Sequence, residues 1–372
     1  MISADIATLV QCPDCASPLA PVTPRPQAGA TSGGRDLAQP VPSMTCTGCA
    51  RTFDASRGYL DLQPLEVFAE RTKYLDHELH ADARHEAIAP PVLGSRIRND
   101  MLRRFLRPGR GDRIVDLGCG SGRTIVWNAG SGAAILGVDV SPFFAAEAVD
   151  KADLILGDLR RLPLASGRFD KAWSLDVMEH LSPEALTDVL AEANRVLAPG
   201  GALFVYTHVR TNGWPALGVR LVNRFASLCE RIGLIDLRQE RLRKSDHLNP
   251  LVDHAHLRRT AAAAGFEIER ITYYSPVIGA FFENVVARMA ERWLSRRASR
   301  RLPAASASDE TAGVREARRA TQARVRRGGV LYWCLRVATA IMKIDLLLFG
   351  RIPTGPFFAL LRKPGVQQDG AG

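Results

Sequence analysis

The chain of 372 residues has few of the features that accompany secretion. Its first ten residues have neither a basic segment nor a long apolar core, so they do not resemble a signal peptide. Seven cysteines are too few for a disulfide framework in a chain of this length. We therefore expect a cytoplasmic protein, with room for one large domain and a small one.

The excess of basic over acidic residues is concentrated in one late segment. The formal net charge is +10, and residues 288–327 hold 12 arginines against 4 acidic residues, a net +8. The rest of the chain is left with +2 and is close to neutral. A near-neutral remainder argues against a broad nucleic-acid footprint, and we expect no DNA partner.

The stretch from Asp112 to Gly122 reads as a buried strand followed by a tight turn. Ile114, Val115 and Leu117 suit the strand, and the glycines of the turn let a ligand approach the backbone closely. They stand at alternate positions: Gly118, Gly120 and Gly122. A helix over 124–129 would then present free N–H groups to that ligand. By itself, such a turn fits a nucleotide-binding loop of any kind.

Further strands follow the turn at regular intervals. Counting the strand before the turn as the first, the second is predicted at 133–138. It ends in Asp139, about 20 residues after the first glycine, where an acid can bind ribose hydroxyls. The third, fourth and fifth strands are predicted at 154–156, before Gly157-Asp158, at 169–175 and at 202–207, and a sixth runs from Phe266 to near Tyr273. Alternation of this kind predicts an α/β fold with a parallel sheet.

This order of motifs resembles the class I S-adenosylmethionine-dependent methyltransferases over about residues 112–266. The matching motifs are Val-Asp-Leu-Gly-Cys-Gly-Ser-Gly, Gly-Val-Asp-Val-Ser-Pro, Gly-Asp-Leu-Arg-Arg-Leu-Pro-Leu, Phe-Asp and Leu-Ala-Pro-Gly-Gly. A nicotinamide dehydrogenase would need a third glycine at position 123, where Arg123 stands. The resemblance implies a Rossmann-like seven-stranded sheet with helices on both faces, and S-adenosyl-L-methionine as the cofactor.

The resemblance also assigns cofactor roles. Asp139 would bind the ribose, Asp116 would orient the turn, and Asp158 would accept a hydrogen bond from the adenine amino group, with Leu159 nearby. The implied cofactor-binding residues are Asp116, Gly118, Cys119, Gly120, Gly122, Asp139, Val140, Asp158, Leu159 and Leu175.

The segment after the fourth strand, Asp176-Val177-Met178-Glu179-His180, is expected to face the transferred methyl group. We predict His180 as the general base, with Glu179 or Asp176 orienting it. The segment also resembles the Glu-x-x-Glu-His motif of ubiquinone-pathway O-methyltransferases and small-RNA 2′-O-methyltransferases, which helps hold a divalent metal. A further histidine ligand could then come from His247, or from the pair His254 and His256. From the sequence alone, the segment around His180 could be a metal site, a general base or simply the start of a helix.

Two Cys-x-x-Cys pairs precede this domain. Cys12 and Cys15, with Cys46 and Cys49, can present four thiolates to one structural Zn²⁺. The Pro-, Gly- and Ala-rich loop 17–44 between them is predicted to be flexible. This segment resembles the zinc ribbons of tRNA-methyltransferase activators and of ribosomal-RNA guanine-N1 methyltransferases, although the latter use a histidine as the fourth ligand.

The chain divides into five predicted parts. Within the core, the insertion 208–253 has an amphipathic apolar spacing from Leu217 to Ile235, which predicts an acceptor pocket or lid. The parts are a separable zinc ribbon at 1–64, a helical lead-in at 65–107, the methyltransferase core at 108–280, a basic insertion at 281–329, and an apolar helix with the last strand at 330–372.

Residues 330–349 are nearly all apolar but contain charges that make a membrane span unfavourable. The helix could pack against the sheet, or lie at a membrane surface so that residues 288–349 make peripheral contact. We favour burial, because Pro356 to Leu361 beyond it reads as the seventh strand.

Three functions fit these features. The first is O-methylation of a small, lipid-linked or glycosidic acceptor. The second is RNA methylation, which the ribbon and the arginines would suit, although no Asn/Asp-Pro-Pro-Tyr signature of base methylation follows the fourth strand. The third is a non-catalytic cofactor-binding partner protein, which the intact motifs disfavour.

Overall fold

The computed structural model describes residues 3–22, 43–66, 88–237, 241, 247–290, 292–293 and 329–365. Most of the predicted flexible loop 17–44, residues 67–87 of the helical lead-in expected at 65–107 and most of the arginine-rich segment lie outside these residues.

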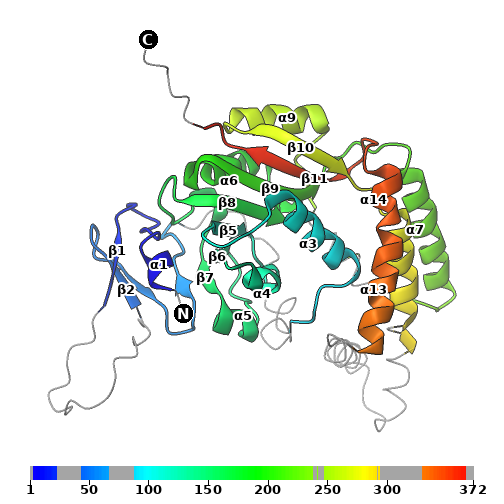
Figure 1. Ribbon diagram of the computed structural model, residues 1–372, viewed down its shortest axis with the longest axis horizontal. Helices are drawn as coiled ribbons and strands as arrows, with labels where there is room; N and C mark the ends of the chain where they lie inside the picture. Colours follow the sequence, from blue (N-terminus) through cyan, green and yellow to red (C-terminus); the bar gives the residue numbers. More distant parts are fainter. Residues whose placement is uncertain are drawn as a thin grey trace, which may run out of the picture.

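One eight-stranded sheet forms the centre of the molecule (Figure 1), in the order β10-β11-β9-β8-β5-β6-β7-β4. Only β11 runs antiparallel to its neighbours. The strands are β4 Leu60–Asp61, β5 Arg113–Leu117, β6 Ala134–Asp139, β7 Asp153–Leu156, β8 Phe169–Leu175, β9 Leu197–His208, β10 Glu267–Tyr273 and β11 Pro356–Arg362. The seven predicted strands are therefore present, and β4 adds an eighth that the sequence did not predict.

The two faces of the sheet carry two separate apolar cores. Successive strand residues point to opposite faces, so Ile114 and Phe204 belong to one core while Val115 and Leu203 belong to the other. Both faces are covered by helices, which explains the nearly continuous apolar runs of the central strands.

Helices from different parts of the chain cover each face. Apolar residues of α3 Leu93–Leu106, α4 Arg123–Asn128 and α5 Ala146–Lys151 join one core. The opposite core receives α6 Pro183–Val196 and α9 His254–Ala263. Short 3₁₀ turns lie at Ala129–Ser131 (η3), Leu159–Arg161 (η4) and Met178–His180 (η5).

The N-terminal segment is not a free-standing domain. It forms α1 Ala4–Ala7 and a small antiparallel sheet of β1 Leu19–Pro21, β2 Ser43–Cys46 and β3 Thr52–Asp54. Its last strand, β4, pairs in parallel with β7 of the main sheet. Its apolar side chains, such as Ile6 and Phe53, belong to the same core as Val115 of β5. The segment predicted as a zinc ribbon therefore shares the apolar core of the main sheet.

A layer of helices lies at the end of the molecule opposite the N-terminal sheet (Figure 1). It comprises α7 Ala216–Arg231, α10 Val277–Ala280 continuing as the π-helix η6 Phe281–Val286, α13 Val330–Met342 and α14 Ile344–Phe349. The single helix expected at 330–349 is thus interrupted at Lys343.

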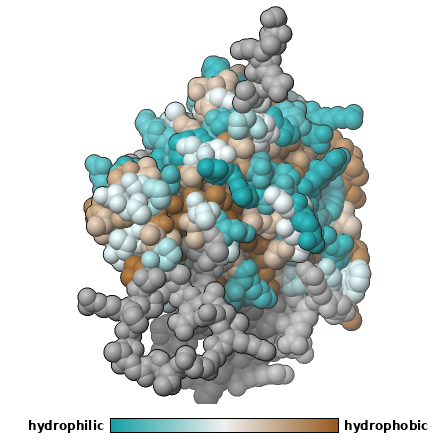
Figure 2. All heavy atoms as spheres, turned by 60° about the vertical axis from the view of Figure 1, so that its left-hand side comes forward, coloured by the Kyte–Doolittle hydropathy of each residue, from teal (hydrophilic) through white to brown (hydrophobic). Residues whose placement is uncertain are grey.

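Figure 2 turns the N-terminal side forward, and hydrophilic residues are spread over much of that face.

The expected burial of residues 330–349 is only partly correct. Thr339, Met342 and Asp345 are buried on the inner side, but Val337 is 61% exposed and Leu347 is 84% exposed. In the described ranges, every helix is too short or too polar to meet the requirements of a membrane span.

Candidate active site

The glycine turn joins β5 to α4, and its three glycines differ in what surrounds them. Gly118, Gly120 and Gly122 all have positive φ, at 78°, 54° and 80°. A Cβ at Gly118 would lie 2.5 Å from Val177 Cγ2, and one at Gly122 would lie 2.6 Å from Ala148 Cβ. A Cβ at Gly120 would meet nothing within 4 Å. Packing therefore requires glycine at both ends of the turn, whereas the middle glycine borders open space that a ligand can enter.

Asp139, the last residue of β6, holds this turn against the sheet. Its Oδ2 accepts a hydrogen bond from the Gly120 N–H at 2.7 Å, and its Oδ1 accepts one from the Ser141 N–H at 2.8 Å. Burial raises the pKa of this carboxyl group above its ordinary value. Each carboxylate oxygen can accept a second hydrogen bond, so Asp139 can also bind ligand hydroxyls over the turn.

Asp116 lies beneath the turn on β5 and is almost fully buried, at 2% exposed. Among the described residues, its Oδ2 accepts no hydrogen bond of good geometry, and the indole N–H of Trp173 is the neighbouring donor that favours its charged form. Burial, assisted by the nearby Asp139 carboxylate, raises the pKa of Asp116 to about 7. Buried acceptors are normally satisfied, and this oxygen therefore fits a bound group that supplies a donor or a positive charge.

The other predicted cofactor residues surround the turn with different constraints. Asp158 already binds the Arg160 guanidinium, with Nη2–Oδ2 at 2.8 Å and Nε–Oδ1 at 3.0 Å. The Val140 carbonyl accepts a hydrogen bond from Gln63 Nε2 at 3.3 Å, so the N-terminal segment reaches the edge of the site. Cys119 is buried, and its thiol lies close to Gly137 of the sheet. Its N–H donates to the Val138 carbonyl and its carbonyl accepts from the Gly122 N–H, so its backbone holds the turn in place. Leu159 and Leu175 are half-buried.

The loop after β8 adjoins the glycine turn through the contact between Val177 and Gly118. Asp176 has a left-handed backbone, with φ at 56°, and its Oδ2 lies 3.2 Å from Arg98 Nε of α3. The same guanidinium lies 5.4 Å from the ring centroid of Tyr206. The sequence did not predict Arg98, because its sequence neighbours form no recognisable motif.

Glu179 is buried in η5, at 2% exposed. Its Oε2 accepts a hydrogen bond from Thr207 Oγ1 of β9 at 2.9 Å, and its carbonyl accepts one from the Asn249 N–H at 2.9 Å. Burial, with the Asp176 carboxylate nearby, raises the pKa of Glu179 to about 8. This backbone hydrogen bond links the insertion 208–253 to the loop that carries Glu179 and His180.

Three imidazoles gather beside Glu179. The ring centroids of His180 and His247 are 4.6 Å apart, and those of His208 and His247 are 5.3 Å apart. Ligand atoms of Glu179, His180 and His247 all lie within 4.8 Å of one another. His208 was not predicted, although its place at the carboxyl end of β9 is a signal that could have found it.

The other two candidate histidines have structural positions instead. His254 Nε2 lies 2.9 Å from the Thr354 carbonyl oxygen, and its ring packs on Tyr273 and Phe357. His256 Nδ1 accepts a hydrogen bond from the Val252 N–H at 3.3 Å. Of the alternatives for a third ligand, His247 alone joins the cluster that the structure describes around Glu179 and His180.

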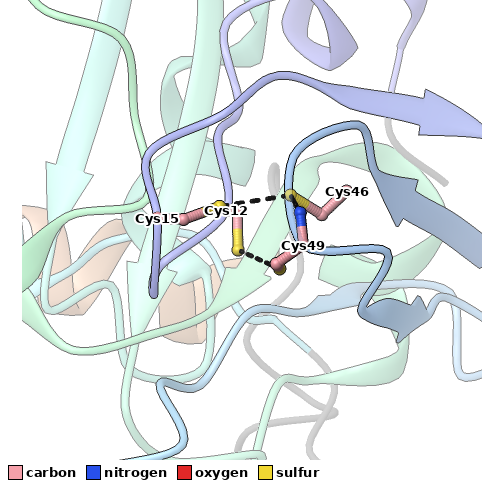
Figure 3. A group of neighbouring side chains, drawn as sticks. All are labelled: Cys12, Cys15, Cys46 and Cys49. Atoms are coloured by element: carbon pink, nitrogen blue, oxygen red, sulfur yellow. Dashed lines mark hydrogen bonds between the residues drawn. The ribbon is translucent and has the colours of Figure 1, made fainter.

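The N-terminal cysteines form a compact quartet (Figure 3). The Sγ atoms of Cys12 and Cys49 are 3.7 Å apart, and those of Cys15 and Cys46 are 3.4 Å apart. The Gly48 and Cys49 N–H groups donate to the Cys46 sulfur. Tetrahedral Zn–S bonds of about 2.3 Å put sulfur atoms about 3.8 Å apart, so the quartet has the spacing that a zinc ion needs.

Comparison with known families agrees with this geometry. Residues 115–205 match the family described as a methyltransferase domain. This range contains the glycine turn, Asp139 and the segment from Asp176 to His180.

Curated relatives match the same part of the chain. An uncharacterised methyltransferase of Synechocystis is 32% identical over 28% of this chain and 50% of its own length. A ubiquinone biosynthesis O-methyltransferase of Azorhizobium caulinodans is 36% identical over 34% of this chain and 53% of its own length. The chain thus spans about half the length of these relatives.

Among solved structures, phosphoethanolamine N-methyltransferase 2 of Haemonchus contortus is 18% identical, with a TM-score of 0.47. The similarity covers 81% of this chain and 61% of that one. The strand order, the glycine turn and the family match lead to one conclusion: the chain contains a class I S-adenosylmethionine-dependent methyltransferase domain.

Proposed function

We propose that the protein is an S-adenosylmethionine-dependent O-methyltransferase that acts on a small or lipid-linked acceptor. The relatives named for O-methylation include the ubiquinone enzyme, a tocopherol O-methyltransferase of Arabidopsis thaliana and a malonyl-[acyl-carrier protein] O-methyltransferase of Erwinia pyrifoliae. One observation carries the cofactor part of the proposal. The turn is open at Gly120, with Asp139 bound to its backbone and the buried carboxyl group of Asp116 beneath it.

In this proposal, Asp139 binds the ribose hydroxyls of the cofactor. The backbone at Gly120 lies against the cofactor, and Asp116 provides negative charge for its cationic end. The bound cofactor supplies an electrophilic methyl group. The remaining task of the protein is to hold the acceptor oxygen in line with that methyl group and to remove its proton.

His180 is the proposed general base. Its loop contacts the turn through Val177 and Gly118, which supports placing the acceptor next to the cofactor. The buried carboxyl group of Glu179 would orient His180 and the histidines beside it. Asp176, which pairs with Arg98, would instead shape the acceptor pocket. The 4.8 Å grouping of Glu179, His180 and His247 also supports the alternative that they bind a divalent cation which orients the acceptor oxygen.

The cysteine quartet is proposed as a structural zinc site. The four sulfur atoms would complete a closed tetrahedron and leave no position open for substrate. In this proposal, the ion stabilises the N-terminal segment, whose last strand lengthens the sheet beside β7.

Calorimetry with S-adenosylhomocysteine tests the cofactor site. Asp139→Ala removes both acceptors for the ribose hydroxyls, and we expect affinity to fall about 10- to 100-fold, at about 1 to 3 kcal/mol for lost hydrogen bonds. Asp188→Ala, an exposed change on α6, is the matched control and should bind like the wild type. Equal affinity of the Asp139→Ala variant and the wild type would show that the cofactor binds elsewhere.

Metabolite profiling tests the reaction class. A strain that lacks the gene should accumulate a hydroxyl compound one methyl group lighter than a wild-type species. The wild-type gene and a His256→Ala variant should restore the methylated species, and a His180→Ala variant should not. Methyl label appearing in RNA, with no change in small molecules, would overturn the proposed acceptor class.

Manganese binding, followed by electron paramagnetic resonance, separates the metal alternative from the base. If Glu179, His180 and His247 bind a divalent ion, His247→Ala should weaken Mn²⁺ binding and His256→Ala should not. If neither the wild type nor the His256→Ala variant binds Mn²⁺, the metal alternative is excluded and His180 remains the proposed general base.

A further inference from the structure

Helix α7 turns its apolar stripe toward solvent instead of toward the sheet. The five residues of this stripe recur at three- and four-residue intervals and are 48% to 64% exposed. They are Leu217, Leu221, Phe225, Leu228 and Ile232. The opposite side of the helix, with Ala226 and Cys229, is buried against Val285. Within the described residues the stripe therefore has no packing partner, although the opposite side of the helix is packed.

Helices α13 and α14 present a second outward stripe of the same kind. Its members are 39% to 82% exposed, and they are Val330, Trp333, Val337, Ile341, Ile344 and Leu348. Polar groups of these helices lie on other sides: Lys343 Nζ binds Asp100 Oδ2 at 2.6 Å, and Asp345 is buried. The outward stripe consequently consists of apolar residues over its whole length.

Helices α7, α13 and α14, which carry the two stripes, belong to one layer of helices at one end of the molecule (Figure 1). Trp214, just before α7, packs on Phe349 at the end of α14, with ring centroids 5.8 Å apart. Between them, η6 adds exposed Phe281 and Val286. We call the two stripes together the apolar face.

Positive charge accompanies the apolar face. Arg220, Arg224 and Arg231 are exposed beside the stripe on α7. The segment 294–328, which precedes α13 in the chain, contains ten arginines and three acidic residues, a net +7. Apolar side chains beside arginines complement the two layers of an anionic membrane surface, its acyl chains and its acidic headgroups.

We propose that the apolar face docks the protein on the surface of an anionic lipid bilayer. Helix α13 has 13 residues and is about 20 Å long, less than the ~30 Å hydrocarbon core, so it would lie along the interface instead of crossing it. The arginines beside the stripe favour acidic lipid over a second copy of this chain, which would bring the same positive charge. The inference goes beyond the proposed reaction and does not depend on it.

Cosedimentation of the full chain with vesicles tests this docking. The protein should bind vesicles of phosphatidylcholine with phosphatidylserine more tightly than vesicles of phosphatidylcholine alone, at ~0.1 M salt, and added salt should weaken that binding. The double variant Leu221→Asp/Val337→Asp places a negative charge in each stripe. It should weaken binding to the vesicles by about tenfold or more. Leu65→Asp, at a residue 73% exposed outside the apolar face, is the matched control.

A second variant keeps the test decisive if the first does not fold. Arg220→Gln/Arg224→Gln changes exposed groups only and should weaken binding to the phosphatidylserine vesicles while retaining S-adenosylhomocysteine binding. The proposal is overturned if the wild type does not sediment with these vesicles. It is equally overturned if folded Leu221→Asp/Val337→Asp binds like the wild type, or if the wild type forms a dimer that this variant abolishes.

Discussion

Asp116 illustrates how one buried residue can link stability to the proposed ligand site. Its carboxyl group lies on β5, is 2% exposed and has an oxygen that accepts no hydrogen bond of good geometry in the described part of the chain. A charged carboxylate in such a place is unfavourable unless a ligand compensates it. The side chain therefore fits a role in ligand binding better than a role in folding.

We predict that Asp116→Asn makes the ligand-free protein less sensitive to pH. In the wild type, burial raises the pKa from 3.8 to about 7, so the folded state binds more protons than the unfolded state between these values. Stability should therefore be greatest below about pH 4 as far as this group is concerned, and should fall as pH rises toward about 7. At about pH 8 the variant should be more stable by on the order of 1–3 kcal/mol.

Urea unfolding across this pH range measures the difference. The same variant should bind S-adenosylhomocysteine more weakly, because the negative charge near the ligand is lost. Stability curves of the wild type and the variant that run parallel with pH would contradict the assignment.

At the scale of elements, α6 supports the candidate site from the opposite core. Ser182 caps the helix, with its Oγ accepting a hydrogen bond from the Ala185 N–H at 3.2 Å, and Pro183 occupies the first turn. Leu186 and Leu190 pack under the sheet. The helix directly follows η5, so its start fixes where the Glu179 and His180 segment ends.

Ser182→Ala should lower the free energy of unfolding by about 1 kcal/mol, because one N–H group loses its cap. The matched control is Thr187→Ala, which removes an exposed hydroxyl from the same helix and should cost less. Chemical denaturation checks both variants. A wild-type stability for Ser182→Ala would mean that the cap does not contribute to the fold.

Over the whole molecule, the cysteine quartet and the methyltransferase domain are physically joined. Cys12 and Cys46 lie in the same apolar core as Leu136 and Val138 of β6, and Leu62 N–H donates to the Leu156 carbonyl at 2.8 Å. Loss of order around the cysteines would expose the edge of β7. Removing residues before Leu65 is therefore expected to destabilise the whole protein.

We predict about one equivalent of zinc in the purified protein, held by the cysteine quartet. Stripping it with a chelator, or Cys46→Ser, should lower the melting temperature of the entire protein in one cooperative transition. Cys334→Ser, at an exposed cysteine outside the quartet, is the control and should change neither metal content nor melting. Two separate transitions, with the main one unmoved, would show that the segments unfold independently.

The sequence by itself determined seven of the eight strands of the main sheet, the glycine turn and the grouping of the four cysteines. β8 has the bounds that the apolar pattern predicted, and β11 forms where Pro356 to Leu361 indicated, between β10 and β9. These features follow from local periodicity and fixed spacing. A buried strand needs apolar neighbours along the chain, and a turn with positive φ needs glycine.

Only the tertiary structure decided which distant residues meet. Arg98 reaches Asp176, and His247 joins His180, across long stretches of sequence whose local patterns record no such contact. Periodicity likewise revealed the stripe from Leu217 to Ile232 but not the side it would face. Amphipathic spacing fixes one face of a helix, and the helices packed around it determine whether that face meets the core or the solvent.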